Sequence, residues 1–276
     1  GGSAWRQNKL EVGDKILKVR QENDLEAVNV VGMRTDDAVK LIKGPKGTSV
    51  ILTLKKVDGS VVDLSIPRDV IELEETYAKS AYVEKGGVVY GVINLPKFYA
   101  DFADYNKRNA AGDIKKEITR LKSEGMEGLV LDLRNNGGGS LREANQLTGL
   151  FIETGTTVQV RYADGMIQKQ MDRNPLLAYN GPLVVLVNRY SASASEIVAG
   201  ALQDHKRAVI LGTKSFGKGS VQTIIPLSGR GAIRMTTALY YTPSGNSIQA
   251  KGIVPDVKVE QSVVQKVNGP KRRSEA

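Results

Sequence analysis

Three polar loops in this sequence carry residue types that could do chemistry, and each follows a run of apolar residues. The loops read RNNGGGS (134–140), NRYSASASE (188–196) and GTKSFGKGS (212–220). Functional groups gather where loops leave the carboxyl ends of strands in open α/β sheets. A plain turn is the simpler interpretation of each loop taken alone. Their shared position after apolar runs makes the three loops the candidates for a site.

The segment SASASE places Ser191, Ser193 and Ser195 at the expected start of a helix. Serine caps helices well, but capping explains one serine and not three. The alternative is a serine nucleophile on a strand-to-helix turn, where backbone N–H groups and the helix dipole stabilise an oxyanion. Such a nucleophile needs a base.

The one histidine of the sequence cannot be that base. His205 lies twelve residues after Ser193, on the same expected helix. A rise of about 1.5 Å per residue puts the two about 18 Å apart. This distance excludes a Ser-His-Asp triad within one chain. His205 is expected to be a surface residue near a helix end.

Lysine is the base that remains. A lysine base must be neutral, and burial favours the neutral form. Lys218 lies between Gly217 and Gly219, where closely packed backbones exclude water, whereas most other lysines lie in polar runs. An exposed lysine in a turn is the alternative at this point.

The same loop also resembles a phosphate-binding loop. Gly212, Gly217 and Lys218 match the first part of G-x-x-x-x-G-K-[ST], but Gly219 stands where that pattern needs a hydroxyl for a magnesium ion. In RNNGGGS, three successive glycines allow unusual backbone conformations whose N–H groups can point at one spot. Such donors suit an oxyanion or a phosphate, and a flexible turn is the alternative.

Alternating strands and helices are expected to position these loops. Apolar runs predict strands at 87–95, 129–133, 182–187 and 208–211. Helices are expected near 141–152 and at about 196–205. A further helix is expected to be capped by Asp113, to end at Gly125 and to bury Ile114, Ile118 and Leu121. This alternation predicts an α/β layer architecture after about residue 75.

The first 70 residues predict a small β-rich domain with one helix. A strand follows the Gly13-Asp14 turn, and a hairpin joins 49–54 to 61–66. The helix is expected to be capped by Thr35, to bury Ala38, Leu41 and Ile42, and to stop at Gly44-Pro45.

Composition excludes several classes of protein. The 276 residues contain 41% apolar and 25% charged residues, as in ordinary globular proteins. No apolar run approaches the roughly 20 residues that span a bilayer, and no signal peptide is recognisable. Cysteine is absent, which excludes disulfides and thiolate metal sites. The net charge of +9 is partly confined to the end of the chain, so 263–276 is expected to be a basic flexible tail and no nucleic-acid partner is expected.

Four long segments together resemble the carboxyl-terminal processing proteases, also called tail-specific proteases. They are LDLRNNGGG (131–139), NRYSASASEIVAGALQD (188–204), SFGKGSVQ (215–222) and YYTPSGNSIQAKGIVPDV (240–257), in the family's order. With LEVGDKILKV (10–19), the resemblance covers roughly 10–260. It implies a partial PDZ-like domain over 1–70 and a crotonase/ClpP-like α/β protease core over 75–262, an α+β protein overall.

The resemblance implies a Ser-Lys pair, with Ser193 as nucleophile and Lys218 as base. Some members add a glutamine four residues after the lysine, which here is Gln222 and would orient the lysine amine. Four residues of straight strand span about 13 Å, so the loop must curl for Gln222 to reach Lys218.

The oxyanion donors carried over from the family are backbone N–H groups of Ala194 and of the glycine loop, at Gly138 or Gly139. Asp204 matches an acid that the family often has, and a structural role is expected for it. No metal or cofactor is required by this mechanism.

The family cleaves proteins near their C-termini and docks the substrate tail beside a PDZ helix. Val39 and Ile42 would contact the peptide. The sequence departs from the family here, because the strands and carboxylate-binding loop that the family carries before its G-S-P-A segment do not precede GGSAW. Half of the docking groove is therefore expected to be missing, and the chain to be a fragment or a PDZ fold completed differently. The resemblance also implies a periplasmic, extracytoplasmic location and allows a homo-oligomer.

Three functions stay open from the sequence. The first is a serine endopeptidase that uses the Ser-Lys pair. The second is a non-catalytic peptide-binding module, inactive because its PDZ domain is incomplete. The third, and weakest, is a nucleotide-binding protein that uses GTKSFGKGS (212–220).

Overall fold

The structure is a computed structural model that describes residues 2–70, 74–101, 104, 107–229 and 231–259, so the predicted tail at 263–276 lies outside the described residues. The chain divides into two compact units, Gly1–Glu74 and Glu75–Ala276. Each unit has its own cluster of buried apolar side chains. No helix in the described ranges has the length and apolar character needed to cross a membrane.

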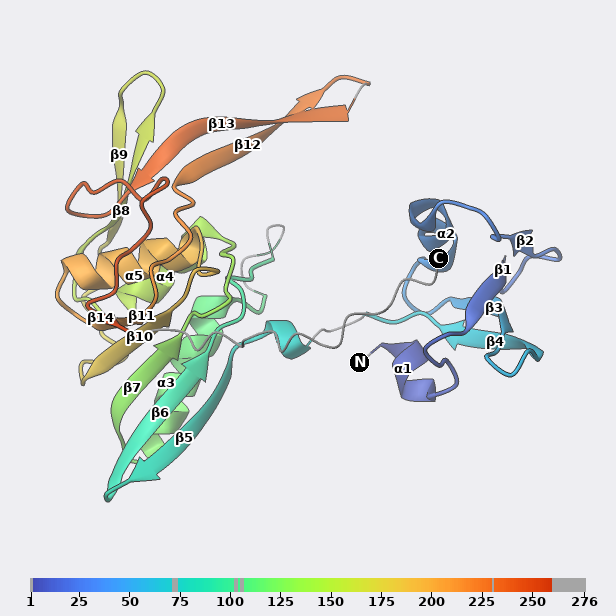
Figure 1. Ribbon diagram of the computed structural model, residues 1–276, viewed down its shortest axis with the longest axis horizontal. Helices are drawn as coiled ribbons and strands as arrows, with labels where there is room; N and C mark the ends of the chain where they lie inside the picture. Colours follow the sequence, from blue (N-terminus) through green and yellow to red (C-terminus); the bar gives the residue numbers. More distant parts are fainter. Residues whose placement is uncertain (1, 71–73, 102–103, 105–106, 230, 260–276) are drawn as a thin grey trace, which may run out of the picture. The chain divides into compact units, whose positions relative to one another are not determined.

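The N-terminal unit is a four-stranded antiparallel sheet with two helices, as the sequence predicts for a small β-rich domain (Figure 1). Its strand order is β2-β1-β3-β4. Its elements are α1 (Ser3–Gln7), β1 (Lys15–Gln21), β2 (Val28–Asn29), α2 (Thr35–Ile42), β3 (Ser49–Lys55) and β4 (Val61–Pro67). The predicted hairpin is confirmed, because β3 pairs with β4 along its whole length.

Helix α2 has the predicted apolar stripe, but its residues are partly buried and not fully buried, and the predicted cap is wrong. Ala38, Leu41 and Ile42 pack against the buried core of the unit. The N-cap is Arg34, which has extended backbone and no capping side-chain bond, so Thr35 is the first helical residue and does not cap the helix.

The C-terminal unit is built on a six-stranded sheet with the order β14-β11-β10-β7-β6-β5. All neighbouring pairs are parallel except β5 with β6. Its elements are β5 (Lys79–Lys85), β6 (Val88–Asn94), α3 (Ala110–Ser123), β7 (Met126–Asp132), α4 (Leu141–Gly149), β10 (Leu183–Val187), α5 (Ala194–Asp204), β11 (Val209–Gly212) and β14 (Val257–Lys258). This confirms the predicted α/β core.

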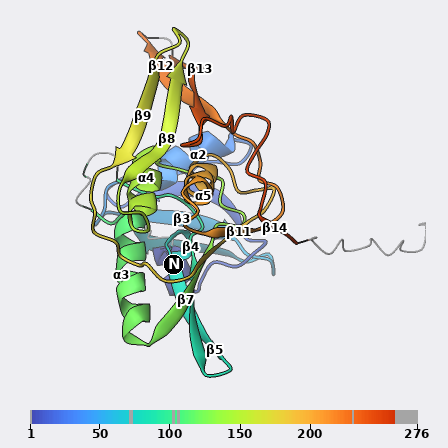
Figure 2. The same cartoon turned by 90° about the vertical axis from the view of Figure 1, so that its left-hand side faces the viewer.

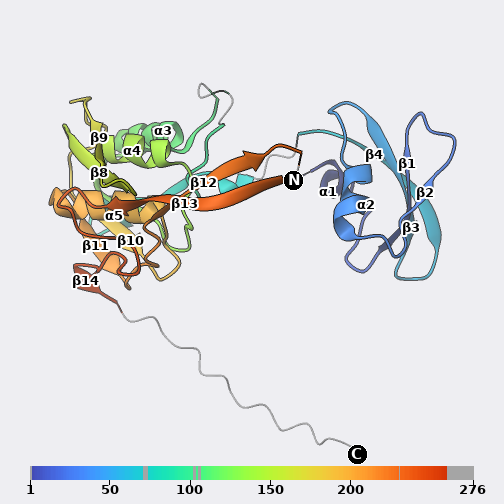
Figure 3. The same cartoon turned by 90° about the horizontal axis from the view of Figure 1, so that it is seen from above.

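Strand order brings the three candidate loops to one edge of this sheet. β10 lies between β7 and β11 in parallel register, so the three strands end on the same side. RNNGGGS follows β7, NRYSASASE follows β10, and GTKSFGKGS begins at the last residue of β11. Helix α3 contacts α4, and α4 contacts α5, which follows the serine loop (Figure 3).

Helix α3 begins earlier than predicted, and Asp113 is not its cap. Asn109 is the N-cap, and its Oδ1 accepts the N–H of Gly112 at 2.8 Å. Asp113 lies buried in the first turn, where Arg108 and the Tyr99 hydroxyl donate to its carboxylate at 2.5 and 2.8 Å. The predicted buried face is confirmed, because Ile114, Ile118 and Leu121 are fully buried.

A second sheet of the C-terminal unit was not predicted from the sequence. Its order is β12-β13-β8-β9, from two hairpins, β8 (Gly155–Tyr162) with β9 (Ile167–Asp172) and β12 (Ser220–Leu227) with β13 (Gly231–Tyr241). Both hairpins extend from the same end of the unit (Figure 2). β12 and the first half of β13 are largely exposed, so neither shows the alternation of buried and exposed residues that marks a half-buried strand.

Candidate active site

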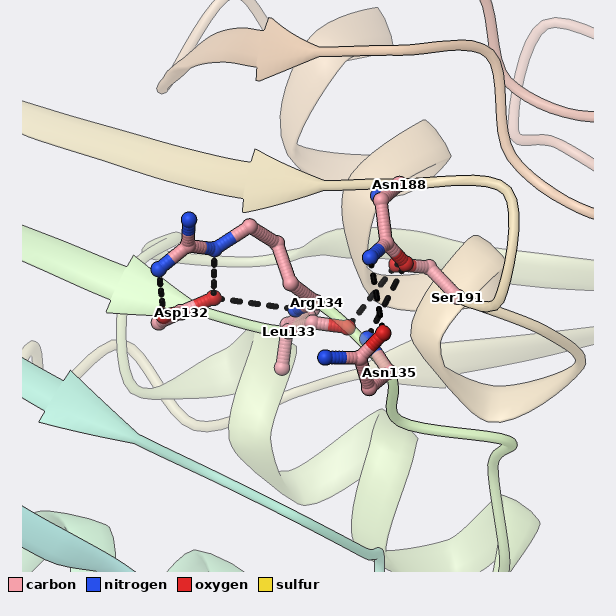
Figure 4. A network of polar contacts seen from close by, with 6 residues as sticks. All are labelled: Asp132, Leu133, Arg134, Asn135, Asn188 and Ser191. Atoms are coloured by element: carbon pink, nitrogen blue, oxygen red, sulfur yellow. Dashed lines mark hydrogen bonds and ion pairs between the residues drawn. The ribbon is translucent and has the colours of Figure 1, made fainter. Parts of the chain in front are cut away.

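Ser191 joins the loop after β10 to the loop after β7. Its hydroxyl donates to the carbonyl oxygen of Leu133 at 2.8 Å and accepts the backbone N–H of Asn188 at 2.9 Å (Figure 4). The side chain of Asn188 is also bound to Asn135, through Nδ2 to Oδ1 at 2.9 Å and through Oδ1 to the Asn135 N–H at 3.0 Å (Figure 4). Ser191 is therefore a buried structural residue.

Ser193 differs from the two serines beside it. Ser195 is fully buried and donates its hydroxyl to the carbonyl oxygen of Asn136 at 2.8 Å, whereas Ser193 is half-buried. Ser193 is the N-cap of α5, with φ 58° and ψ −112°. Residues other than glycine rarely adopt positive φ, and strain of this kind gathers at functional sites. A serine on a strained strand-to-helix turn has the geometry of a nucleophile elbow.

Gly138 packs directly against this turn. Its φ is +102°, and a Cβ there would lie 2.8 Å from the Ala192 carbonyl oxygen and 2.9 Å from Ser193 Cβ. The same Cβ would lie 3.1 Å from the backbone nitrogen of Ala194. Only glycine fits at this position, so the glycine loop packs directly against the serine turn.

Of the three predicted oxyanion donors, the N–H of Gly138 does not fit this role. Its N–H donates to Asn136 Oδ1 at 2.9 Å, so it is already committed to an acceptor. Within the described part of the chain, the N–H groups of Ala194 and Gly139 have no hydrogen-bond acceptor. Gly139 is held by backbone contact with Phe98, whose carbonyl oxygen would lie 2.2 Å from a Cβ at Gly139.

Asn136 holds the glycine loop and the serine turn together. It is fully buried, and its Nδ2 donates to the Leu95 carbonyl oxygen at 2.7 Å while its Oδ1 accepts from Gly138. Its own carbonyl oxygen accepts the Ala192 N–H at 3.0 Å and the Ser195 hydroxyl at 2.8 Å. No sequence pattern indicates this role, because the partners of Asn136 come from three separate segments of the chain.

The lysine loop has the tight backbone packing that its glycines predict. A Cβ at Gly219 would lie 2.3 Å from the backbone nitrogen of Gln249, and one at Gly217 would lie 3.1 Å from the carbonyl carbon of Ala250. Lys218, between them, is half-buried. It is therefore not the fully exposed turn lysine of the alternative interpretation.

Glu196 connects the serine turn to the lysine loop. It is fully buried, and its Oε2 accepts the backbone N–H groups of Ser193 and Lys218, each at 2.8 Å. Its Oε1 accepts the Ser215 hydroxyl and the Gly217 N–H, each at 2.6 Å. The sequence signal for part of this arrangement was present, since a glutamate three residues after a serine N-cap is a capping box. The two backbone nitrogens bound to one oxygen at 2.8 Å lie at most 5.6 Å apart.

The side chains of Ser193, Lys218 and Gln222 are not hydrogen-bonded to one another in the part of the chain that the structure describes. Among the described residues, no hydrogen bond links Ser193 Oγ to Lys218 Nζ, or Gln222 to Lys218. Gln222 is exposed in β12, where it pairs with Thr236 next to an irregularity in the strand register. The roles of these side chains stay predictions.

The prediction for His205 is confirmed, and the structural role of Asp204 stays a prediction. His205 is exposed at the C-cap, and its Nε2 lies 2.8 Å from the Thr156 carbonyl oxygen, at the opposite end of the helix from Ser193. Asp204 has a structural contact, since its Oδ2 accepts the Ser244 N–H at 2.8 Å.

A cavity of about 450 Å³ opens beside the site, at the carboxyl ends of the parallel strands. Arg134 and Asp132 form an ion pair at 2.7 Å in its wall (Figure 4). Neither Ser193 nor Lys218 lines this cavity. The described residues contain no group of three or more His, Asp or Glu side chains placed to hold a metal ion.

The N-terminal unit has a separate cavity of about 450 Å³, lined mainly by apolar side chains. Ile42 of α2 lines it together with Ile16, Val50 and Leu52, and Val39 does not. Of the two residues predicted to contact a peptide, Ile42 therefore lines an apolar cavity and Val39 does not line it.

The sequence is similar to two families of known proteins. It matches Peptidase family S41 over residues 89–259 and the PDZ domain over residues 1–55. The first range contains all three candidate loops, and the second contains α1 to β3.

Curated relatives include the tail-specific protease of Haemophilus influenzae, 38% identical over 286 residues, covering 100% of this chain and 40% of the relative. Another is the carboxy-terminal-processing protease of Bartonella bacilliformis, 41% identical over 263 residues, covering 93% of this chain and 56% of the relative. The chain thus spans about half the length of these relatives. Among solved structures, the photosystem II D1 C-terminal processing protease matches with a TM-score of 0.59 and 31% identity, over 94% of this chain and 66% of that one.

Proposed function

We propose that this chain, which belongs to peptidase family S41, carries the catalytic centre of a serine endopeptidase in which Ser193 is the nucleophile and Lys218 its base. The observation that carries the proposal is the strained, half-exposed Ser193 at the N-terminus of α5, with its backbone tied through Glu196 to that of Lys218. The neighbouring serines support it, because both of their hydroxyls are committed to backbone carbonyls.

The chemistry is acyl transfer. Ser193 Oγ forms a bond to the peptide carbonyl carbon while its proton passes to Lys218 Nζ. The oxyanion accepts hydrogen bonds from the free N–H groups of Ala194 and Gly139, and the dipole of α5 adds to this stabilisation. Lys218 gives the proton to the leaving amine as the C–N bond breaks. Water then cleaves the acyl-enzyme, losing its proton to Lys218, which returns it to Ser193.

The proposal requires Lys218 Nζ to turn toward Ser193 Oγ. The backbone nitrogens of the two residues are at most 5.6 Å apart, since one oxygen binds both at 2.8 Å. A lysine side chain has a flexible four-carbon stem. The movement that we propose for this contact is a change of side-chain rotamer. Gln222 is proposed to orient the amine in that state.

The proposed substrates are proteins or peptides with accessible C-termini. The relatives from Haemophilus influenzae and Bartonella bacilliformis are named for tail-specific and carboxy-terminal processing. In the N-terminal unit, the apolar cavity beside Ile42 offers a place for an apolar side chain of such a peptide. A non-catalytic peptide-binding module is the second candidate, favoured by the absence of a Ser193–Lys218 hydrogen bond among the described residues.

The test is cleavage of a loosely folded protein by the 276-residue chain at mildly alkaline pH. Wild type, Ser193→Ala and Lys218→Ala are run side by side, and fragments are identified by mass. We expect cleavage by wild type alone, because each variant lacks one partner of the proton transfer. Cleavage by Ser193→Ala would refute the proposed nucleophile. Peptide binding by the folded wild type without any turnover would favour the non-catalytic module.

A further inference from the structure

We infer that Glu196 is a positioning residue for the reaction, whose carboxylate sets the placement of Lys218 relative to Ser193. The inference rests on the proposed function and deepens it. Glu196 touches neither substrate nor reacting atoms in this arrangement. It acts through the two backbones that it holds.

Helix capping does not account for the contacts of Glu196. A capping box explains one of them, the bond from the N–H of Ser193. The other three donors are the Ser215 hydroxyl and the N–H groups of Gly217 and Lys218, which lie 19 to 22 residues further along the chain. A cap needs none of them, so the carboxylate is placed to bind the lysine loop to the serine turn.

The surroundings of Glu196 require a carboxylate and not merely an acceptor. Four donors meet its two oxygens, and three of them are backbone N–H groups, which can only donate. The fourth, the Ser215 hydroxyl, already accepts the Ile253 N–H at 2.6 Å. Ionised carboxylates accept at both oxygens, whereas an amide offers one oxygen and one donor group.

The geometry ties this residue to the rate of proton transfer. The bonds to Ser193 and Lys218 share one atom, Oε2, and both measure 2.8 Å. A shift of that atom therefore changes how the base approaches the nucleophile. Misplacement by about 1 Å can cost about 10²-fold in rate. Binding of the substrate elsewhere on the chain would be unaffected.

The test compares Glu196→Gln with a matched control, Glu143→Gln. Either orientation of the amide in Glu196→Gln sets its NH₂ against a backbone N–H, from Ser193 and Lys218 or from Gly217. Glu143 is buried to a similar degree in the same unit, and its carboxylate accepts the Ala111 N–H at 2.9 Å, a bond that an amide oxygen can also accept. Both variants keep size and lose one charge.

Peptide cleavage and the labelling rate of Ser193 by a fluorophosphonate probe are measured for both chains. For Glu196→Gln we expect kcat and the labelling rate to fall about 10²-fold, with KM within about twofold of wild type. For Glu143→Gln we expect kcat, KM and the labelling rate to match those of wild type. A structural defect alone would lower the amount of active enzyme and would not change the labelling rate of the molecules that remain folded.

An unchanged kcat and labelling rate in folded Glu196→Gln would overturn the inference. So would an equal loss in Glu143→Gln. If Glu196→Gln does not fold, Glu196→Asp carries the test, because its shorter side chain keeps the charge but cannot span both loops. A folded Glu196→Asp with wild-type kcat would likewise overturn it. Failure of wild type itself to cleave or to react with the probe would instead refute the proposed function.

Discussion

At the scale of single residues, the site depends on positions that have no room for a larger side chain. Gly138 is the clearest case, because the space for its side chain is already occupied by the backbone of Ala192 and by Ser193. Its positive φ adds strain for any other residue. A methyl group at this position would displace the serine turn from the glycine loop.

We predict that Gly138→Ala abolishes cleavage and fluorophosphonate labelling while the chain stays folded. The positive φ alone costs about 1–3 kcal/mol for a non-glycine residue, and the contact with the Ala192 carbonyl at 2.8 Å forces a local shift. Gly137→Ala is the control, because no atom lies within 4 Å of a Cβ there. Near wild-type labelling in Gly138→Ala, or equal loss in both variants, would contradict the prediction.

The residues proposed to do chemistry are recognisable in the sequence, whereas the residues that hold them in place are not. Ser193 and Lys218 stand in motifs whose residue types alone suggest a nucleophile and a base. Asn136 and Glu196 also lie in the candidate loops, but their bonds to Leu95 and to Lys218 form only when the strands of the sheet pair. Gly138 was predicted as an oxyanion donor, but its N–H donates to the side chain of Asn136, two residues earlier in the same loop.

At the scale of elements, helices α3, α4 and α5 each contain a buried acidic residue: Asp113, Glu143 and Glu196. Glu143 in the first turn of α4 is nearly fully buried, and burial raises the pKa of its carboxyl, against a smaller opposing effect of the hydrogen bond from Ala111. A raised pKa means that folding favours the protonated acid. The stability from this group is present at low pH and is lost as pH rises through the folded-state pKa.

We predict that Glu143→Gln raises the melting temperature of the C-terminal unit at neutral pH. The amide keeps an oxygen for the Ala111 N–H and removes the cost of ionising a buried acid. The gain should vanish below about pH 4, where the wild-type side chain is protonated in both states. Scanning calorimetry from pH 3 to 8 measures the difference in melting temperature between the variant and wild type. A gain that is equal at all pH values, or that grows as pH falls, would contradict the assignment.

Buried elements were predicted better than exposed ones. The strands at 129–133, 182–187 and 208–211 are continuous apolar runs and were found close to their observed bounds. The β12–β13 hairpin was missed, because its exposed residues leave no periodic signal. Both predicted helix caps were wrong, by one residue at Thr35 and by four residues at Asp113. Asp113 was expected to cap α3, but a buried contact with Arg108 holds it inside the first turn and Asn109 caps the helix.

At the scale of the whole molecule, the chain has two separate hydrophobic cores. The core of Gly1–Glu74 contains Leu54, and that of Glu75–Ala276 contains Leu131, both fully buried. No buried residue belongs to both clusters in the described ranges. Each unit therefore has its own source of stability.

We predict that Leu54→Ala destabilises the N-terminal unit alone. Removal of a fully buried leucine side chain costs about 2–5 kcal/mol. Hydrogen exchange should speed up in peptides from 1–74 and stay unchanged in peptides from 75–259. Leu25→Ala is the control, since Leu25 is 100% exposed in the same unit. Faster exchange in both units would show that the two do not unfold independently.

The order of β7, β10 and β11 has a consequence for how this protein can change over generations. The three site loops leave adjacent strands, so their spacing is about 4.8 Å per strand and is fixed by backbone hydrogen bonds between strands. Any apolar side chain that preserves the ladder leaves that spacing as it is. Apolar residues of these strands can therefore be exchanged for other apolar residues while the distance between the site loops stays the same.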